Sequence, residues 1–229
     1  MLRRVLPTRC AVCGAWPCHN GGTPGCAACH AQAVAKPPRC PRCALHLAQP
    51  HQPHACTRWL HASAAALDYA FAWRDLVLAF KTEPQLAWAP AWAQLMYQAA
   101  LRGQLSLRQA RWWLPIPMAA ARLRQRGFNH AWVLAQALAQ HTGGQSHLHP
   151  HLLQRTLDDQ QQHRRSRRQR LAAATAWHVA QPEAVAGQRV VLIDDIMTTG
   201  PTLDTAAHCL LEAGAAQVDA LVLARAPLA

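Results

Sequence analysis

Residues 190–203 read VVLIDDIMTTGPTL, and this stretch decides the fold. Its four leading aliphatic residues show no alternation with polar ones, which is typical of a parallel strand covered on both faces. Two carboxylates, Asp194 and Asp195, follow where that strand is expected to end. A loop of small and hydroxyl residues, 198–202, then runs into a helical pattern. This order predicts an α/β fold in which a helix N-terminus and free backbone N–H groups face the loop.

The chemistry of the loop favours a phosphorylated sugar as ligand. A glycine lets the backbone approach a phosphate, and threonine hydroxyls add donors. We expect phosphate contacts from the loop residues Thr198, Thr199, Gly200, Pro201 and Thr202. The two acids suit the 2- and 3-hydroxyls of ribose, so ribose 5-phosphate fits the stretch. The absence of a Gly-x-x-x-x-Gly-Lys-Ser/Thr pattern argues against a nucleoside-triphosphate site. A buried strand ending in a solvated Asp-Asp turn is the alternative.

The stretch resembles the phosphoribosyl-pyrophosphate (PRPP) motif of type I phosphoribosyltransferases. That resemblance implies that Asp194 and Asp195 contact the ribose hydroxyls and are the catalytic pair. It also implies that the loop binds the 5-phosphate and that Mg²⁺ accompanies PRPP. The chemistry implied for a catalytic member is displacement of pyrophosphate at C1 of ribose, with the cation and basic groups stabilising the leaving charge.

Length and composition limit the number of domains and the kinds of partner that this chain can have. The 229 residues allow one main domain and a small module, which we divide at residues 1–60 and 61–229. A formal charge of +12 favours polyanionic partners: nucleic acid, anionic phosphates or a membrane surface. No apolar run reaches transmembrane length, and the start MLRRVLPTRC has no apolar signal-peptide core. We therefore expect a cytoplasmic protein without membrane insertion.

Cysteines mark the N-terminal module. Eight of the nine fall within the first 56 residues, and six of these form three Cys-x-x-Cys pairs. Two residues between thiolates is a spacing that presents both sulfurs to one tetrahedral zinc. In a cytosolic chain such clustering indicates a structural metal rather than disulfides. The simplest first zinc site uses the first two pairs, Cys10, Cys13, Cys26 and Cys29.

The second zinc site is incomplete in cysteine. Cys40, Cys43 and Cys56 supply three ligands, but Trp59 stands where a fourth Cys-x-x-Cys needs sulfur. Either His51 or His54 is the fourth ligand, or the site is lost. Two further interpretations fit the same cysteines: an arrangement that interleaves the first and third pairs, and a decayed or redox module.

Residues 44–62, rich in His, Pro and Gln, have the composition of a linker. Leu67–Trp73 then predicts a strand, and Asp75–Thr82 a short helix with one apolar face. Lys81 closes this helix as either a phosphate contact or a cation favoured by the helix dipole. Leu86–Leu101 predicts an amphipathic helix.

A second basic region follows the predicted strand and proline turn at Trp112–Pro117. Arg122 and Arg126 lie one helical turn apart and could reach an anion together, unless they form only a solvated basic turn. The pattern then predicts a helix from Ala131 to about Gln140. Towards the C-terminus it predicts a helix at Leu203–Ala213 and a buried strand at Gln217–Leu223.

Five arginines occur within Arg164–Arg170, with no acid among them. A lid that closes over pyrophosphate, a nucleic-acid contact strip and a solvated helix face each explain such a run. Aromatic residues, which would strengthen a single-strand binding interpretation, are absent from it.

Taken as a whole, the chain resembles the ComF family. The landmarks are the cysteine pairs, residues 126–130 (Arg-Gly-Phe-Asn-His, usually ending in Gln) and the PRPP stretch. Arg155 and the Gln- and Arg-rich residues after it resemble that family's lid region. The resemblance implies a zinc ribbon joined to a phosphoribosyltransferase-like parallel sheet flanked by helices. It also implies a role in DNA uptake during natural transformation, with PRPP, single-stranded DNA and competence proteins as partners. The rival functions are a metabolic phosphoribosyltransferase for a base or amine, and a non-enzymatic nucleic-acid adaptor.

Overall fold

The structure is a computed structural model that describes residues 8–18, 25–34, 38–47, 49, 54–82, 86–156 and 177–227. Arg164–Arg170 and His51 lie outside the described residues, so the predictions made for them stay predictions. The helices and strands, in chain order, are α1 (Ala27–Val34), β1 (Ser63–Asp68), α2 (Trp73–Thr82), η2 (Leu86–Trp88), α3 (Ala89–Arg102), η3 (Leu107–Gln109), β2 (Trp112–Pro115), α4 (Ala120–Arg126), α5 (His130–Thr142), η4 (Gln145–His147), β3 (Leu153–Arg155), β4 (Trp177–Val179), α6 (Pro182–Val185), β5 (Arg189–Met197), α7 (Pro201–Glu212) and β6 (Gln217–Arg225).

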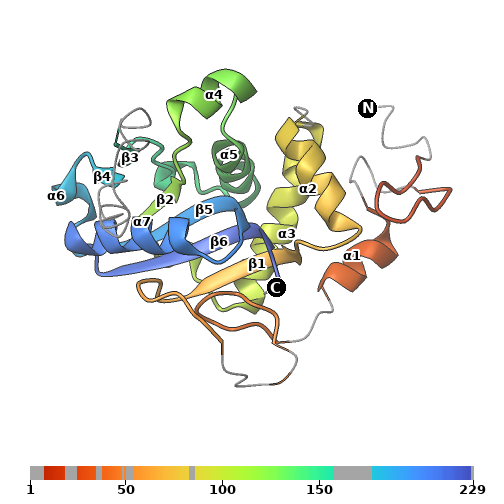
Figure 1. The fold of residues 1–229 in the computed structure, drawn as a ribbon, viewed down its shortest axis with the longest axis horizontal. Helices are drawn as coiled ribbons and strands as arrows, with labels where there is room; N and C mark the ends of the chain where they lie inside the picture. Colours follow the sequence, from red (N-terminus) through yellow and green to blue (C-terminus); the bar gives the residue numbers. More distant parts are fainter. Residues whose placement is uncertain are drawn as a thin grey trace, which may run out of the picture.

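A four-stranded parallel sheet with helices on both sides forms the centre of the molecule (Figure 1). The strand order is β1-β6-β5-β2, and all three neighbouring pairs are parallel. Strands β3 and β4 form a separate antiparallel pair. The predicted parallel sheet flanked by helices is confirmed. The predicted helices are also confirmed, with small shifts at their ends.

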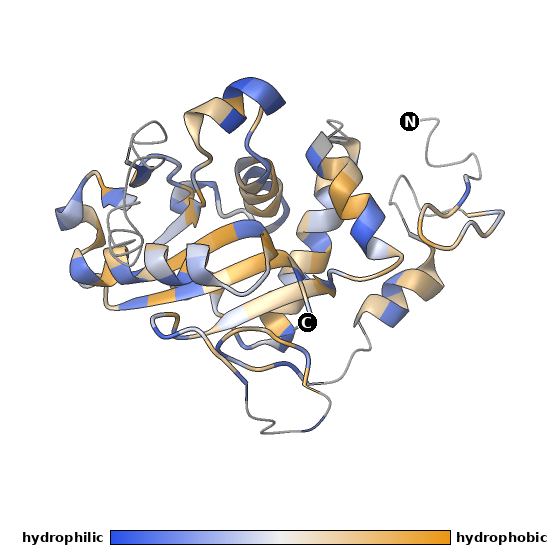
Figure 2. Cartoon of the chain, viewed as in Figure 1, coloured by the Kyte–Doolittle hydropathy of each residue, from blue (hydrophilic) through white to orange (hydrophobic). Residues whose placement is uncertain are grey.

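The central strands are buried on both faces. In β5, Val191 and Ile193 pack in the hydrophobic cluster that contains residues of α3 and α5, which we call the α3/α5-face cluster. Val190 and Leu192 pack in the opposite cluster, which contains residues of α7 and which we call the α7-face cluster. Figure 2 shows hydrophobic colour along β5 and β6 between the helices. Burial of alternate residues on two apolar faces explains the unbroken aliphatic run in the sequence.

The strand predicted at Leu67–Trp73 is wrong in position. The strand is β1, after which the chain turns, and Trp73 instead begins α2. Phe71, predicted within the strand, is 92% exposed. Alternating aromatic residues suggested the wrong segment, because half of the residues in the true strand are alanine, which has low β propensity. Ala64–Ala66 are all buried, so packing overrides propensity here.

The described part of residues 44–62 is not a linker. Leu45, Leu47 and Leu60 are buried in the α7-face cluster. The backbone N–H of His61 donates to the carbonyl of Val218 at 2.9 Å, which ties this segment to β6. The polar composition of the segment gave no sign that its isolated leucines pack in the α7-face cluster.

The cysteine-rich segment shares its core with the rest of the chain. Cys10 and Cys29 belong to the α3/α5-face cluster, whereas Cys40 and Cys43 belong to the α7-face cluster. The segment therefore packs on both sides of the sheet, and the predicted domain boundary at residue 60 stays a prediction. Among the described residues, no helix is long and apolar enough to cross a lipid bilayer.

Asn129 joins the end of β2 to the start of α5. Its Oδ1 accepts from the N–H of Ala131 at 3.0 Å, and its Nδ2 donates to the carbonyl of Ile116 at 3.0 Å. We expect Asn129→Ala to lower the free energy of unfolding by about 1–2 kcal/mol in urea titrations. Asn129→Ser should lose less, because serine still caps the helix although it cannot reach Ile116. Equal losses in the two variants would contradict a capping role.

Candidate functional site

The two acids of the PRPP stretch lie past the end of a neighbouring strand. β2 ends at Pro115, which pairs with Ile193, whereas β5 continues beside β6 as far as Met197. The prediction that the strand stops before Asp194 and Asp195 is therefore wrong, since both acids lie within β5. They are still accessible to a ligand, because β2 no longer covers that edge of β5. Parallel α/β sheets bind ligands at this carboxyl end.

Groups from two helices lie beside the Asp195 carboxylate. Its carboxylate is 3.1 Å from Lys81 Nζ of α2 and 3.9 Å from His130 Nδ1 of α5. Asp195 is only 8% exposed, and a buried carboxylate is stabilised by a neighbouring cation such as Lys81. His130 Nε2 lies 3.0 Å from the Lys81 carbonyl, which can only accept, so Nε2 carries a proton. Burial lowers the pKa of His130 and favours the neutral ring.

Asp194 has a different environment although it is the next residue. Burial and the neighbouring charge of Asp195 raise the pKa of Asp194 well above its usual range. The backbone N–H of Asp195 donates to Asp194 Oδ1 at 2.8 Å, and Lys81 acts in the same direction, but neither outweighs burial. An added cation or hydrogen-bond donor would therefore do most to stabilise the charged form of Asp194.

One cavity of about 180 Å³ collects the polar groups at this edge. Its lining is Lys81, Ile116, Pro117, Met118, Ala119, Arg122, Arg126, Asn129, His130, Ala131, Arg155, Asp194, Asp195 and Thr202. Larger cavities of about 340, 500 and 210 Å³ lie elsewhere. The first two have no carboxylate in their lining, and the third has only Asp219, which is already bonded to His61, Ala62 and Gln217. Residue chemistry rather than volume therefore selects this cavity as the candidate site.

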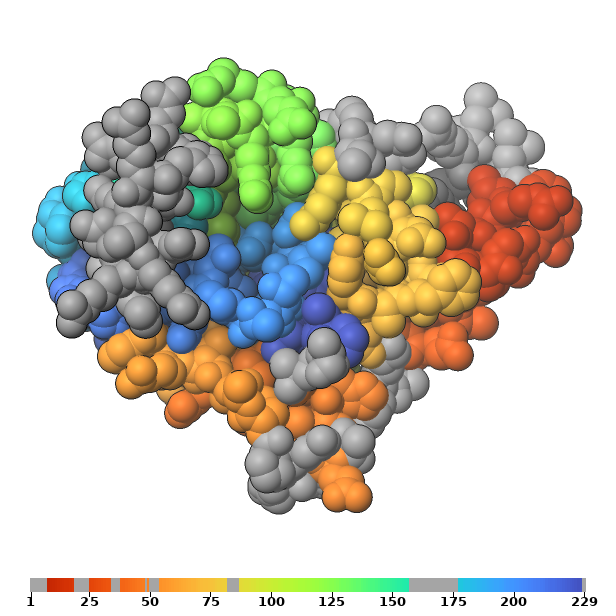
Figure 3. All heavy atoms as spheres, in the orientation of Figure 1, coloured from red at the N-terminus to blue at the C-terminus, as the bar shows by residue number. Residues whose placement is uncertain are grey.

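The cavity brings together six of the residues predicted for ligand binding or catalysis: Lys81, Arg122, Arg126, Asp194, Asp195 and Thr202. Both arginines project from α4, whose last turn is strongly hydrophilic in Figure 2. Figure 3 shows α4 in green above the blue β5–α7 region, with the yellow surface of α2 beside them.

The remaining loop residues, Thr198, Thr199, Gly200 and Pro201, do not line the cavity but form its neighbouring turn. Gly200 has φ +95° and is the N-cap residue of α7, with no side-chain capping bond. The threonines at 198, 199 and 202 are exposed. This arrangement leaves N–H groups at the first turn of a 12-residue helix available for an anion.

The sequence interpretation did not include three polar lining residues, Asn129, His130 and Arg155, among the site residues. Asn129 and His130 belong to the quoted landmark at 126–130, so their signal was visible. Arg155 ends β3, a strand of three residues far from the PRPP stretch in sequence. Spacing alone could not bring it to the same cavity, and its one signal was the resemblance of Arg155 and the residues after it to the family's lid region.

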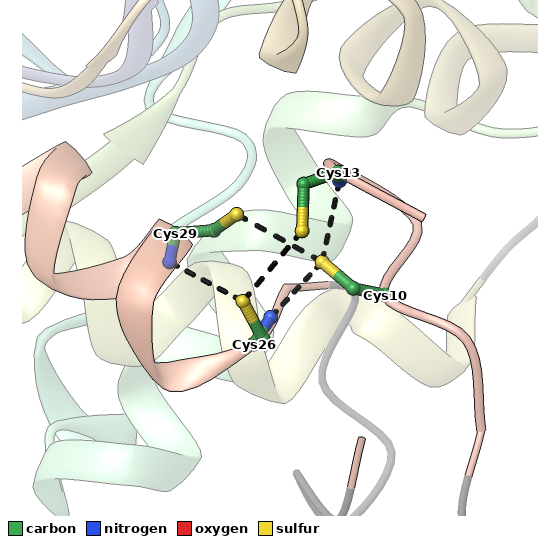
Figure 4. Close-up of side chains that lie close together, drawn as sticks. All are labelled: Cys10, Cys13, Cys26 and Cys29. Carbon is green, nitrogen blue, oxygen red and sulfur yellow. Dashed lines mark hydrogen bonds between the residues drawn. The ribbon is translucent and has the colours of Figure 1, made fainter. Parts of the chain in front are cut away.

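The first predicted metal set forms one compact group (Figure 4). The Sγ atoms of Cys10 and Cys29 are 3.9 Å apart, and those of Cys13 and Cys26 are 3.8 Å apart. Four thiolates around a tetrahedral zinc at about 2.3 Å stand about 3.8 Å from one another, so the set fits this metal. This grouping contradicts the interleaved arrangement, and all of the described cysteines are free thiols.

The second set is Cys40, Cys43, His54 and Cys56, whose ligand atoms lie within 4.8 Å of one another. Cys40 Sγ and Cys56 Sγ are 3.8 Å apart, and Cys43 Sγ is 3.2 Å from His54 Nε2. Among the described residues, His54 therefore completes the group. Three sulfurs and one imidazole also suit tetrahedral zinc.

Each group contains a thiol that ionises readily. Burial opposes ionisation of Cys10, but N–H donors led by those of Cys13 and Cys26 outweigh it and lower the pKa of Cys10 to about 6. Burial likewise opposes ionisation of Cys40, whose pKa is nevertheless lowered to about 7 by N–H groups in its Cys-x-x-Cys turn. Since metals bind the thiolate, both turns are prepared for a cation.

Comparisons with known proteins agree with this geometry. Residues 131–228 match the family described as Phosphoribosyl transferase domain. The competence protein ComFC of Bacillus subtilis is 38% identical over 113 residues, which is 49% of this chain and 43% of that protein. The chain thus matches less than half of that relative. The DNA utilization protein YhgH of Salmonella typhimurium is 30% identical over 81% of this chain and 83% of its own length. YhgH of Escherichia coli O6:H1 is 29% identical over 96% of this chain and 98% of its own.

The fold and the site thus define a protein with a phosphoribosyltransferase domain. The N-terminal metal-binding groups fit a double zinc ribbon ahead of that domain. The chain belongs to the ComF family.

Because the pKa of Asp194 is raised, replacing its carboxyl group with a neutral amide should raise the free energy of unfolding by an amount that depends on pH. The folded state binds the Asp194 proton more tightly than the unfolded state, so this group's contribution to stability falls as pH rises above the unfolded pKa of about 3.9. Asp194→Asn should therefore raise the free energy of unfolding at pH 7, with a difference that shrinks as pH is lowered towards 4. Urea titrations without ligand or Mg²⁺ measure it.

Asp195→Asn is the matched control, because the same change there leaves Lys81 without its 3.1 Å partner. This variant should not be stabilised at pH 7. A destabilised Asp194→Asn protein at neutral pH would contradict a raised pKa at Asp194.

Proposed function

We propose that this protein binds PRPP together with Mg²⁺ in the cavity at the carboxyl end of β5. The supporting observation is the combination, on one cavity, of two carboxylates, two exposed arginines and Lys81, beside an uncapped helix N-terminus. Carboxylates alone would suit a cation, and basic groups alone an anion. A sugar carrying phosphate and pyrophosphate, bound with a divalent cation, needs both.

The proposed roles follow from position. Asp194 and Asp195 would orient the ribose through its hydroxyls, with Lys81 paired to Asp195 at 3.1 Å. The loop at 198–202 and the first N–H groups of α7 would hold the 5-phosphate. Arg122 and Arg126 would contact the pyrophosphate. In a transfer reaction pyrophosphate leaves C1 of ribose, and these basic groups with Mg²⁺ stabilise its charge.

The biological setting that we propose is the handling of DNA taken up in natural transformation, in the cytoplasm. Two considerations support it. The relatives are named a competence protein and DNA utilization proteins. The chain also carries a formal charge of +12, which favours polyanionic partners such as single-stranded DNA. Competence proteins are the further partners that this setting suggests. We propose zinc as the metal of both N-terminal sites.

PRPP binding tests the first part of this proposal. The zinc-loaded wild type should bind PRPP with Mg²⁺ in a calorimetric titration. The Asp194→Asn/Asp195→Asn variant should bind at least about 100-fold more weakly, because the two carboxyl groups that would accept from the ribose hydroxyls are lost.

Asp219→Asn provides the control at the opposite end of the sheet. Asp219 is also buried on a central strand, but it bonds with His61, Ala62 and Gln217, away from the cavity. Its substitution should leave PRPP affinity unchanged. Failure of a folded, zinc-loaded wild type to bind PRPP would exclude both enzymatic interpretations and leave the nucleic-acid adaptor.

DNA binding tests the second part. Affinity for a labelled single-stranded oligonucleotide, measured by fluorescence anisotropy, should fall steeply as salt increases, with a log–log slope of about −0.7 for each phosphate neutralised. Changing Arg165, Arg167 and Arg168 to glutamine should therefore reduce the slope by about 2. Efficient turnover of a base or amine by a protein that does not bind DNA would favour the metabolic function instead.

A further inference from the structure

The second metal group lies next to the phosphate loop, although the two are far apart in sequence. Directly after the ligand Cys56 comes Thr57, a buried residue whose Oγ1 donates to the Arg42 carbonyl at 3.2 Å. A Cβ added at Gly200 would lie 2.9 Å from Thr57 Cγ2 and 2.9 Å from Met197 Cε. Thr57 therefore forms part of the wall against which the left-handed turn at Gly200 is packed.

The next two residues bind the first turn of α7. The backbone N–H groups of Arg58 and Trp59 donate to Asp204 Oδ1 at 2.9 and 2.7 Å. The Trp59 ring lies 4.2 Å, between centroids, from the ring of His208 one turn further along α7. The segment that supplies a metal ligand thus also fixes the helix whose N-terminus faces the proposed phosphate.

Arg225 makes the most direct link. It is 2% exposed, and its Nε donates to the carbonyl of Cys43 at 2.8 Å. Its Nη1 donates to the carbonyl of Met197 at 3.3 Å and to that of Thr198. One guanidinium therefore joins the backbone of a metal ligand to the two residues at which the phosphate loop begins.

The charge of Arg225 needs an explanation, because a guanidinium stays protonated when buried. Its bonds go to neutral carbonyls, and among the described residues no ion pair includes it. A group of three thiolates and one divalent ion carries a net charge of −1. The loaded second group would therefore provide the compensating charge beside Cys43.

The first metal group differs on each of these points. Cys10 and Cys29 pack in the α3/α5-face cluster, and the neighbouring His30 ring lies edge-on to Trp73 of α2. Within the described residues, no hydrogen bond joins residues 8–34 to residues 197–204. The two groups thus form a natural comparison, because only the second contacts the loop.

We propose that the second metal group positions the phosphate loop, with Arg225 as the positioning residue, so that affinity for a phosphorylated ligand depends on metal at this group. This inference rests on the proposed function for its ligand. The loop conformation itself can be tested without any ligand.

The first test compares two exposed ligands, Cys56 of the second group and Cys13 of the first. Full-length wild type, Cys56→Ser and Cys13→Ser are analysed for zinc content and for hydrogen exchange of the backbone amides of residues 198–204. Each variant should lose one zinc per chain. Exchange in the loop should accelerate about tenfold in Cys56→Ser and remain at the wild-type rate in Cys13→Ser. Equal loop exchange in the two variants overturns the proposal.

Arg225→Lys tests the link without removing a ligand, and it decides the matter if Cys56→Ser unfolds. Lysine keeps the positive charge but cannot donate to Cys43 and Met197 together in the same geometry. The variant should retain both zinc ions and slow exchange in β6, yet show faster loop exchange and about tenfold weaker PRPP binding. Unchanged loop exchange in Arg225→Lys overturns the positioning role. If the wild type binds no PRPP, the proposed function fails, but the exchange comparison still decides whether the metal group positions the loop.

Discussion

The buried charge of Asp195 is the constraint on which the site depends. A carboxylate at 8% exposure costs several kcal/mol unless a cation compensates it, and Lys81 does so at 3.1 Å. Lys81 belongs to α2, and its carbonyl also accepts from His130 Nε2 of α5, so this one ion pair connects two helices to the carboxyl end of β5. Among the described residues Asp194 forms no ion pair, so it is the acid that the proposed Mg²⁺ and hydroxyl donors would stabilise.

A second constraint is the size of the cysteine-rich segment. So few residues cannot enclose a core, and the described part instead packs its cysteines into both hydrophobic clusters of the larger domain. Metal would supply the remaining stability. The consequence is that the ribbon and the sheet form one packed structure, in which Cys43 and Thr198 are bridged by a single buried arginine.

Local patterns predicted much of this arrangement. The aliphatic run 190–193, the acids and the loop indicated a parallel strand, a ligand edge and a helix start, and the spacing of Cys10, Cys13, Cys26 and Cys29 predicted a complete metal group. The alanine strand β1 was missed because its residues have little strand propensity and are selected by packing. The choice between His51 and His54 also lay beyond spacing, since it depends on how the intervening chain folds back.

The sequence by itself thus determined the kinds of groups present and the local geometry of each motif. Residues two to four apart have separations set by a strand, a turn or a helix, so their chemistry can be read directly. Only the tertiary structure decided which motifs meet. Lys81, Arg155 and Asp194 share a cavity, and Arg225 reaches Cys43 across 182 residues of sequence. Such contacts depend on strand order and on packing across the sheet, which no local spacing encodes.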